Sequence, residues 1–254
     1  MSIKSFLNKQ TSRKVPQVIV LFWVIKLLTT AMGESTSDFL VHTIDPVVAV
    51  ILGGIGFVIA ISIQFYVKKY IPWVYWLAVT MVAVFGTMAA DVVHIVLGVP
   101  YLISTIFFSI TLAIVFTIWY KSEKTLSIHS IYIPRREVFY WLTVGTTFAL
   151  GTAAGDMTAI TLNLGYLNSG IMFGTLFILP LLAHKFLKLH EVLTFWFSYI
   201  MTRPFGASFA DLFGRTPDLG GLGFGTGKTS IVLGVLIVIF VIYLTISKKD
   251  IEET

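Results

Sequence analysis

Cysteine is absent from the sequence, and charged residues are scarce. The lack of Cys among 254 residues excludes disulfide bonds, thiolate-bound metals and thiol catalysis. Charged residues make up 12%, against roughly 25% in soluble domains. Hydrophobic residues make up 56%, and the mean hydropathy is +0.88. A soluble domain of this size cannot bury so much apolar surface, because most of its surface stays in water. The composition therefore predicts an integral membrane protein.

The N-terminal segment, MSIKSFLNKQTSRK, is polar and basic, and an apolar run begins near Pro16. The run extends past the roughly 7–15 apolar residues of a secretory signal, and no small-residue cleavage site follows. We therefore expect a first membrane-spanning helix here rather than a signal peptide that is removed.

Internal repetition is the strongest pattern in the chain. Each of four segments begins with Trp, has Gly ten residues later and ends with Asp five residues after the Gly. An aromatic residue precedes each Trp. Three fixed positions in four copies rarely match by chance when Trp occurs only six times. The segments are WVIKLLTTAMGESTSD (23–38), WLAVTMVAVFGTMAAD (76–91), WLTVGTTFALGTAAGD (141–156) and WFSYIMTRPFGASFAD (196–211).

A second apolar run follows each copy, and runs of about 20 residues span the roughly 30 Å hydrocarbon core. The sequence thus predicts one all-α transmembrane domain, residues 1–254, with eight transmembrane helices as four two-helix repeats. Each unit crosses the membrane twice, so the copies enter it in the same direction as parallel repeats with pseudo-fourfold or paired twofold symmetry. The second runs cover about 46–67, 100–120, 165–187 and 229–247, and the repeats about 16–67, 72–120, 137–187 and 191–247.

Lys and Arg are concentrated at both ends of the chain and in the joins between repeats. By the positive-inside rule these segments face the cytoplasm, which predicts a multi-pass inner-membrane protein with both termini cytoplasmic. Turns within repeats carry only Arg215 and Lys228, both in the fourth copy. The net charge of +5 is therefore a topology signal, and we expect no nucleic-acid partner. The basic residues are Lys4, Lys9, Arg13, Lys14, Lys68, Lys69, Lys121, Lys124, Arg135, Arg136, Lys185, Lys188, Lys248 and Lys249.

The Asp that ends each copy is predicted to lie at one depth in the membrane. The repeated Trp is expected to anchor each helix at the cytoplasmic interface, where Trp is enriched. The Asp follows 15 residues later, about 22 Å along the helix. Intramembrane carboxylates are costly and are functional candidates by default. A ring of them could bind or conduct a cation or proton, or each could merely hydrogen-bond its own turn. The four are Asp38, Asp91, Asp156 and Asp211.

The position one turn before each Asp breaks the repeat symmetry, because it holds Glu34, Thr87, Thr152 and Ala207. Glu34 lies on the same helix face as Asp38 and joins the predicted cation or proton site. Lys26 precedes Glu34 on nearly the same face, and Arg203 precedes Asp211. Lys26 and Arg203 are the predicted charge partners of the acids. Alternatively, such pairing only allows the helices to insert.

Two histidines follow the acids, His42 after Asp38 and His94 after Asp91. With Glu34 they offer imidazole and carboxylate ligands, which suit manganese, iron or zinc, or a proton relay. The alternative is that each His is an ordinary residue at a helix end. The repeated glycines and nearby alanines are expected to allow close helix packing.

Four helix pairs, each with Trp and a Gly-x-x-x-x-Asp ending, resemble a bacterial membrane-protein family described as four tandem repeats of unknown function. The segment TRPFGASFADLFGRTPDLGGLGFGT is most similar to that family, and the resemblance extends from Trp23 to Tyr243. It implies a bacterial integral membrane protein and supplies no substrate or mechanism.

The leading hypothesis is a small cation transporter or channel, for a divalent metal or coupled to protons, that uses the four Asp residues and Glu34. A second hypothesis is a membrane sensor or scaffold whose acids are structural. An intramembrane enzyme would need a nucleophile or redox group that the sequence lacks, so we expect no enzymatic activity. The expected partners are the lipid bilayer and a small cation, with homo-oligomerisation left open. No cofactor is expected, and a metal ion would be a substrate.

Overall fold

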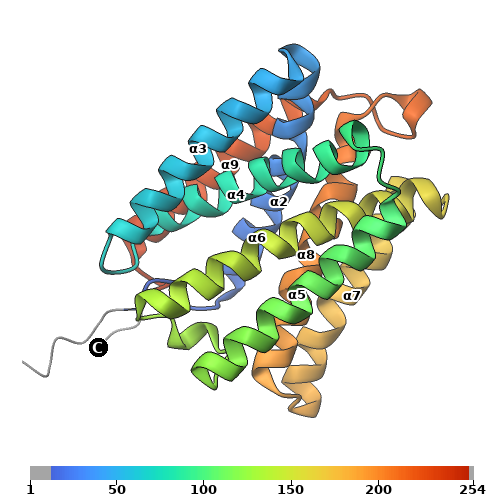
Figure 1. The fold of residues 1–254 in the computed structure, drawn as a ribbon. Helices are drawn as coiled ribbons and strands as arrows, with labels where there is room; N and C mark the ends of the chain where they lie inside the picture. Colours follow the sequence, from blue (N-terminus) through green and yellow to red (C-terminus); the bar gives the residue numbers. More distant parts are fainter. Residues whose placement is uncertain (1–12, 252–254) are drawn as a thin grey trace, which may run out of the picture.

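The structure, a computed structural model, describes residues 13–251. It is all-helical, with no strand among these residues, and its eight long helices follow one another in pairs (Figure 1). The predicted all-α fold of four two-helix repeats is confirmed. Lys4 and Lys9, predicted to face the cytoplasm, lie outside the described residues. The helices are α2 (Val20–Thr43), α3 (Pro46–Tyr66), α4 (Pro72–Asp91), α5 (Tyr101–Glu123), α6 (Pro134–Asp156), α7 (Gly165–Leu187), α8 (Glu191–Gly214) and α9 (Thr226–Ser247).

Local sequence determines where several helices begin and end. Proline opens α3, α4 and α6, where its missing N–H costs no hydrogen bond. Asp45 caps α3 by accepting a hydrogen bond from the Val47 backbone N–H at 2.9 Å. Lys124, Lys188 and Lys248 follow α5, α7 and α9 in the left-handed conformation, with φ of 54° to 57°. The same ending in three repeats reflects their common structure.

Five of the helices are long and apolar enough to cross a membrane by length and composition: α3, α4 with its extension to His94, α5, α7 and α9. The other three, α2, α6 and α8, have a lower apolar content and include charged side chains that are buried in the bundle, such as Lys26, Glu137 and Arg203. The chain is therefore a polytopic membrane protein in which the more polar helices are on the inside.

The first helices of the repeats, α2, α4, α6 and α8, form a closed ring, because each packs against the next and α8 packs back against α2. The repeated glycines lie at these contacts, where an added Cβ would collide with the neighbouring helix. The collision always involves the residue three positions before the glycine of the next repeat. The pairs are Gly33 with Ala83, Gly86 with Phe148, Gly151 with Arg203, and Gly206 with Thr30.

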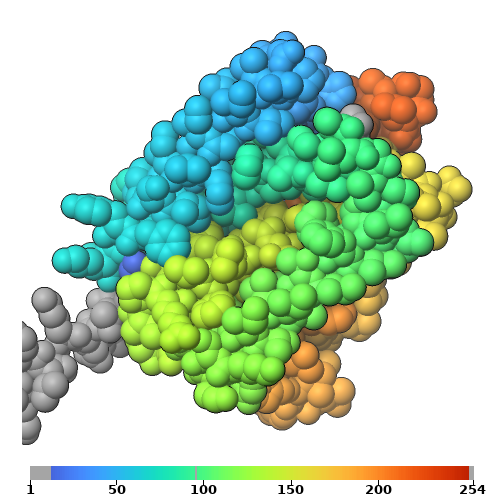
Figure 2. Space-filling view, in the orientation of Figure 1, coloured from blue at the N-terminus to red at the C-terminus, as the bar shows by residue number. Residues whose placement is uncertain are grey.

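The second helices form a shell around this ring. Helices α3, α5 and α7 pack mainly on the first helix of the following repeat, and α9 packs on α2. The last repeat therefore closes onto the first, and each repeat depends on its neighbour for packing. Figure 2 shows one face of this shell, with α3 and α5 on either side and α6 visible between them. Shell side chains such as Ile55, Val58, Ile106 and Phe107 are more than half exposed, as expected for a surface in contact with lipid.

Inside the ring, side chains lie in layers that recur every four residues along each first helix, about 6 Å apart. Almost every side chain in the layers is buried. The layers are Phe22, Tyr75, Tyr140 and Phe195; then Lys26, Val79, Val144 and Tyr199; then Thr30, Ala83, Phe148 and Arg203; then Glu34, Thr87, Thr152 and Ala207; and finally Asp38, Asp91, Asp156 and Asp211.

The repeated Trp side chains do not anchor the protein at the membrane surface as expected. Trp76, Trp141 and Trp196 are at most 6% exposed, and Trp23 is partly buried. Trp196, for example, packs edge-on against Phe116 and donates a hydrogen bond from its indole N–H to the Leu126 carbonyl at 2.8 Å. The sequence pattern was ambiguous because Trp is enriched at interfaces but also fills aromatic cores.

The two ends of the molecule differ. One end, here called the join end, carries the connections between repeats and the chain termini; the other, the turn end, carries the connections within repeats (Figure 1). At the join end, residues 13–19 run from the N-terminus to α2 along the connections between repeats. The Lys14 backbone N–H donates to the Ile131 carbonyl, and the Gln17 backbone N–H donates to the Asp250 carbonyl, both at 2.9 Å. The layer of Asp38, Asp91, Asp156 and Asp211, here called the acid layer, lies toward the turn end.

Substitution of Gly206 tests the closure of the ring. A Cβ at Gly206 would lie 2.8 Å from Thr30 Cβ and 2.9 Å from the Ala31 backbone nitrogen. We expect Gly206→Ala to lower the free energy of unfolding by about 1–3 kcal/mol through overpacking. The matched control is Gly145→Ala in α6, where no described atom lies within 4 Å of the added Cβ and helix propensity favours Ala by up to about 1 kcal/mol. Thermal unfolding in detergent measures both, and equal effects would contradict this account.

Candidate functional site

Arg203 lies on the axis of the ring and contacts the other three ring helices. Its Nη2 donates to Glu34 Oε2 of α2 at 2.6 Å and to Thr152 Oγ1 of α6 at 2.8 Å. It also donates to the Thr87 hydroxyl of α4. The side chain is 1% exposed. A guanidinium group therefore occupies the centre of the bundle at this level and lies across its axis.

Closer to the turn end, Arg215 links two acids of the repeats. It follows α8 directly, and its Nη2 lies 2.9 Å from Asp38 Oδ2 while its Nε donates to Asp211 Oδ1 at 2.8 Å. Burial disfavours the charged form of Arg215, but the Asp211 and Asp38 carboxylates raise its pKa and keep it cationic. Glu34, Asp38 and Asp211 are all buried, and one carboxylate oxygen of each lies within 4.8 Å of the others.

Asp91 and Asp156 complete the layer from α4 and α6. Both are half-buried, and neither has a hydrogen bond or ion pair from its side chain to any residue in 13–251. Each is the last residue of its α-helix and is followed by a π-helical turn, η1 (Val92–Val96) and η3 (Met157–Thr161). Such turns are rare and occur often at functional sites. The acid layer with Glu34 thus sets five carboxylates against two guanidinium groups.

The sequence matches the model of a family described as Repeat of Unknown Function, DUF347, four times. The matches cover residues 21–70, 74–125, 139–189 and 194–250, which together are most of the chain. The chain belongs to the DUF347 family. No curated protein and no solved structure matches it.

The four DUF347 repeats contribute differently to the site. The first and fourth supply the buried acids Asp38 and Asp211 together with Glu34, Arg203 and Arg215. The second and third supply threonines to Arg203 and the unpaired Asp91 and Asp156. The four repeats therefore have similar backbones but different side chains at equivalent positions of the site.

The structure does not bring Lys26 to the acids, contrary to the expected charge partnership. Within residues 13–251, Lys26 Nζ forms no ion pair and lies 4.0 Å from the Phe148 ring centre and 4.1 Å from that of Tyr199. It is two layers below Glu34, on the join-end side of Arg203. The four-residue spacing correctly predicted that Lys26 lies on the same inward face of α2 as Glu34. It does not show that Arg203 of the fourth repeat lies between Lys26 and Glu34.

The two candidate histidine ligands are not assembled into a metal site with the acids. His42 is exposed, and its Nδ1 is 2.6 Å from the Asp38 carbonyl of its own helix. His94 is buried against Tyr101, with Nδ1 3.1 Å from the Val99 carbonyl. Among the described residues, the group that could hold a metal ion consists of Glu34, Asp38 and Asp211. Any ion here would have oxygen ligands alone.

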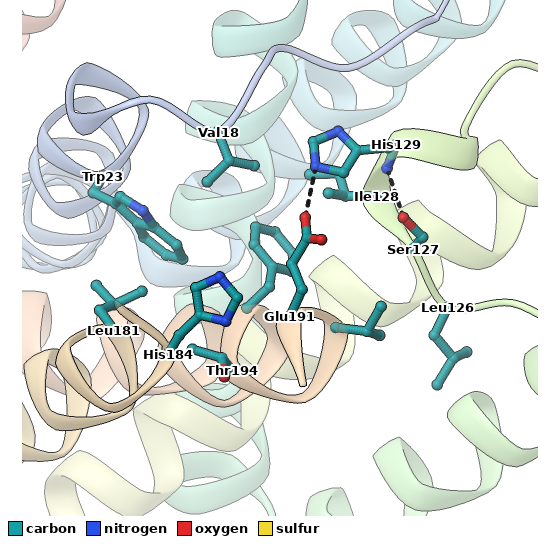
Figure 3. A pocket seen from close by; sticks show the side chains of 12 residues that line it. Val18, Trp23, Leu126, Ser127, Ile128, His129, Leu181, His184, Glu191 and Thr194 are labelled. Carbon is teal, nitrogen blue, oxygen red and sulfur yellow. Dashed lines mark hydrogen bonds and ion pairs between the residues drawn. The ribbon is translucent and has the colours of Figure 1, made fainter. Parts of the chain in front are cut away.

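A cavity with a mixed lining lies at the join end, between the first, third and fourth DUF347 repeats and the join that follows the second (Figure 3). It has a volume of about 230 Å³ and is lined by Trp23, His184 and Phe195 among others. His129 and Glu191 form an ion pair at its edge, with Nε2 3.1 Å from Oε1, as the dashed line in Figure 3 marks. Both partners are more than a third exposed, so this pair adds little stability.

Sequence reasoning missed Arg215 as a site residue. The signal was present, because Arg215 is the first basic residue in any turn within a repeat and lies four residues after Asp211. It also missed the buried cluster at the join end, where Lys14 pairs with Glu137 and Gln64 donates to Glu137 Oε1 at 3.0 Å. Lys14 is thus buried rather than exposed in the N-terminal segment.

A double-mutant cycle tests the coupling of Arg203 and Glu34. Arg203→Met or Glu34→Gln alone leaves a buried group without its charged partner, so each should lower the free energy of unfolding by about 3–5 kcal/mol. The double variant should lose less than the sum of the two by at least about 1 kcal/mol. Arg135→Met is the control, because Arg135 is 67% exposed and its partner Glu123 keeps a second ion pair with Arg136, so this change should alter stability by less than about 1 kcal/mol. Additive losses would show that the pair does not act as a unit.

Proposed function

We propose that this DUF347 protein is a small cation transporter of a bacterial inner membrane, and that the acid layer with Glu34 is its cation site. The observation that carries the proposal is the charge of the layer: Asp91 and Asp156 have no basic partner in residues 13–251, while Glu34, Asp38 and Asp211 are already paired with arginine. Unpaired carboxylates at membrane depth are costly, and a bound cation or proton offsets that cost.

The position of Arg203 on the axis favours a transporter over an open channel. The Arg203 guanidinium repels a cation on the axis and occupies the space through which it would pass. Transport would therefore require the Arg203 contacts to rearrange, so that the acid layer is exposed to the two sides in turn. Arg203 of the fourth repeat is held by Glu34 of the first, so a movement of these repeats against each other, as in alternating access, would break the contact.

The ligand atoms favour a hard divalent cation or a proton. Every acid in the layer offers oxygen, and carboxylates suit magnesium, calcium or manganese rather than softer metals. The sequence-based suggestion of iron or zinc loses support, because His42 and His94 lie outside the group of acids.

A non-transporting sensor or scaffold is the second candidate, and the arginine contacts favour it. Arg203 and Arg215 connect acids and threonines from all four repeats, as residues that only hold helices together would do. In that case neutralising Asp91 or Asp156, which no arginine holds, would have little effect on any property of the protein.

Thermal unfolding with a panel of divalent cations and pH values tests the cation site. We expect a saturable rise in unfolding temperature with one class of cation, because a ligand that binds only the folded state stabilises it. Asp91→Asn or Asp156→Asn should weaken the response at least about tenfold by removing a carboxylate ligand. The control is Asp45→Asn at the same end, since Asn also caps helices and Asp45 is exposed.

Flux into proteoliposomes then separates transport from binding. The cation that stabilises the protein should be taken up by vesicles with wild type and not by those with Asp91→Asn. Stabilisation without flux would favour the sensor, and no response of wild type to any cation or pH would reject the cation site.

The proposed orientation places both termini and the join end in the cytoplasm, with the turn end outside. The chain has no Cys, so single-cysteine variants report the topology without background. An impermeant thiol reagent added to intact cells should label Asp218→Cys, in the exposed turn of the fourth repeat, and not Lys68→Cys, in an exposed join. The reverse pattern would invert the orientation, and labelling of both would disprove parallel repeats.

A further inference from the structure

The cavity at the join end has one acidic side chain in its lining, and no Lys or Arg. The acid is Glu191, which is 64% exposed. Its Oε1 lies 3.1 Å from His129 Nε2. Its second oxygen, Oε2, has no hydrogen bond or ion pair to any residue in 13–251. The cavity therefore offers a charged acceptor that remains open to a ligand.

The two histidines of the lining add a second acceptor, as their hydrogen-bond partners show. An arginine can only donate, so His129 Nδ1 accepts from Arg13 Nη1 at 3.1 Å, and its Nε2 donates to Glu191. The ring of His129 is then neutral and does not cancel the charge of Glu191. A carbonyl can only accept, so His184 Nδ1 donates to the Leu189 carbonyl at 2.7 Å. In the neutral ring this leaves the lone pair of His184 Nε2 for a ligand.

Aromatic and aliphatic side chains form the rest of the lining. The rings of Trp23 and Phe195 pack on each other with their centres 5.6 Å apart. In Figure 3 the Glu191 carboxylate, the His184 ring, Trp23 and Val18 are arranged around the same space. An apolar wall with a few converging polar groups is typical of a site for a small organic molecule.

We propose that the join-end cavity binds a small organic ammonium ion, that is, a protonated amine with a compact apolar body. The ammonium group donates to Glu191 Oε2 and His184 Nε2, and the apolar body packs against Trp23 and Phe195. Aromatic rings also attract a cation. The cavity volume of about 230 Å³ is below the roughly 300–1,000 Å³ of sites for drug-sized ligands, so the ligand is small.

Other classes of ligand fit this lining less well. A small anion would be repelled by Glu191 and would find few free donors, because His129, His184 and Thr194 already donate their hydrogens within the protein. A metal ion needs converging ligands, and among the described residues such a group lies in and beside the acid layer instead. The join-end cavity is separate from the acid layer, so this proposal does not rest on cation transport.

Ligand-observed NMR with benzylammonium chloride tests the site in purified full-length protein. Benzyl alcohol is the neutral probe of similar shape, sodium benzoate is the anionic probe, and the chloride concentration is held constant. We expect saturable binding of benzylammonium, with benzyl alcohol at least about tenfold weaker because it lacks charge-assisted hydrogen bonds. Benzoate should not bind. Titration of protein-free micelles measures the partition of each probe into detergent.

Two pairs of variants locate the binding. Glu191→Gln keeps the shape of the side chain and removes its charge, so it should weaken benzylammonium binding at least about tenfold. Its control is Glu123→Gln, an acid at the same end but outside the cavity lining, which should leave binding unchanged. Val18→Trp should fill the cavity and abolish binding. Val20→Trp adds the same side chain at a position that is 81% exposed and outside the lining, so it should bind as wild type does.

Three results would overturn the ammonium site. Wild type could show no saturable binding beyond that of the micelles, benzyl alcohol could bind as tightly as benzylammonium, or Glu191→Gln could retain full affinity. Because Glu191 is largely exposed, its replacement should not prevent folding, and thermal unfolding checks this. Asp91→Asn should keep benzylammonium binding while it loses the divalent-cation response, so that failure of this site and failure of the proposed cation site are distinguishable.

Discussion

The Arg203 guanidinium has to be hydrogen-bonded inside the ring, because an uncompensated charge in a dry interior costs several kcal/mol. Through Nη2 it donates to one side chain from each of the other three ring helices, including the Glu34 carboxylate that balances its charge. The contact fixes the rotation of these helices about their own axes, and with it the inward direction of the layers above and below. A change in any of the four repeats at this level therefore affects the other three.

Ring closure and shell packing reinforce this arrangement. Glycines bring neighbouring ring helices close enough for a central guanidinium to reach threonine hydroxyls on two of them. The shell helices pack on the following repeat, so no repeat buries its apolar surface by itself. In lipid, where apolar surface alone gives helices little reason to associate, such close packing and polar contacts provide much of the association energy.

Arg203 also separates two regions of opposite character. Toward the turn end, carboxylates outnumber basic groups, and two of them have no partner in the described chain. Toward the join end, Lys26 lies among aromatic rings, above a layer of Phe and Tyr side chains. Four copies of one backbone unit thus enclose an asymmetric interior, and the asymmetry arises almost entirely from the first and fourth repeats.

Hydropathy and the repeated Trp, Gly and Asp positions were sufficient to predict the eight helices, their pairing and the shared depth of the Asp residues, because these depend on spacing along single helices. Spacing also placed Glu34 and Arg203 on inward faces. It could not show that Arg203 meets Glu34 and the threonines, that Arg215 bridges Asp38 and Asp211, that Lys26 lies among rings, or that the Trp side chains are buried. These contacts join residues up to 177 positions apart, and they exist only because the ring closes and brings the fourth repeat against the first.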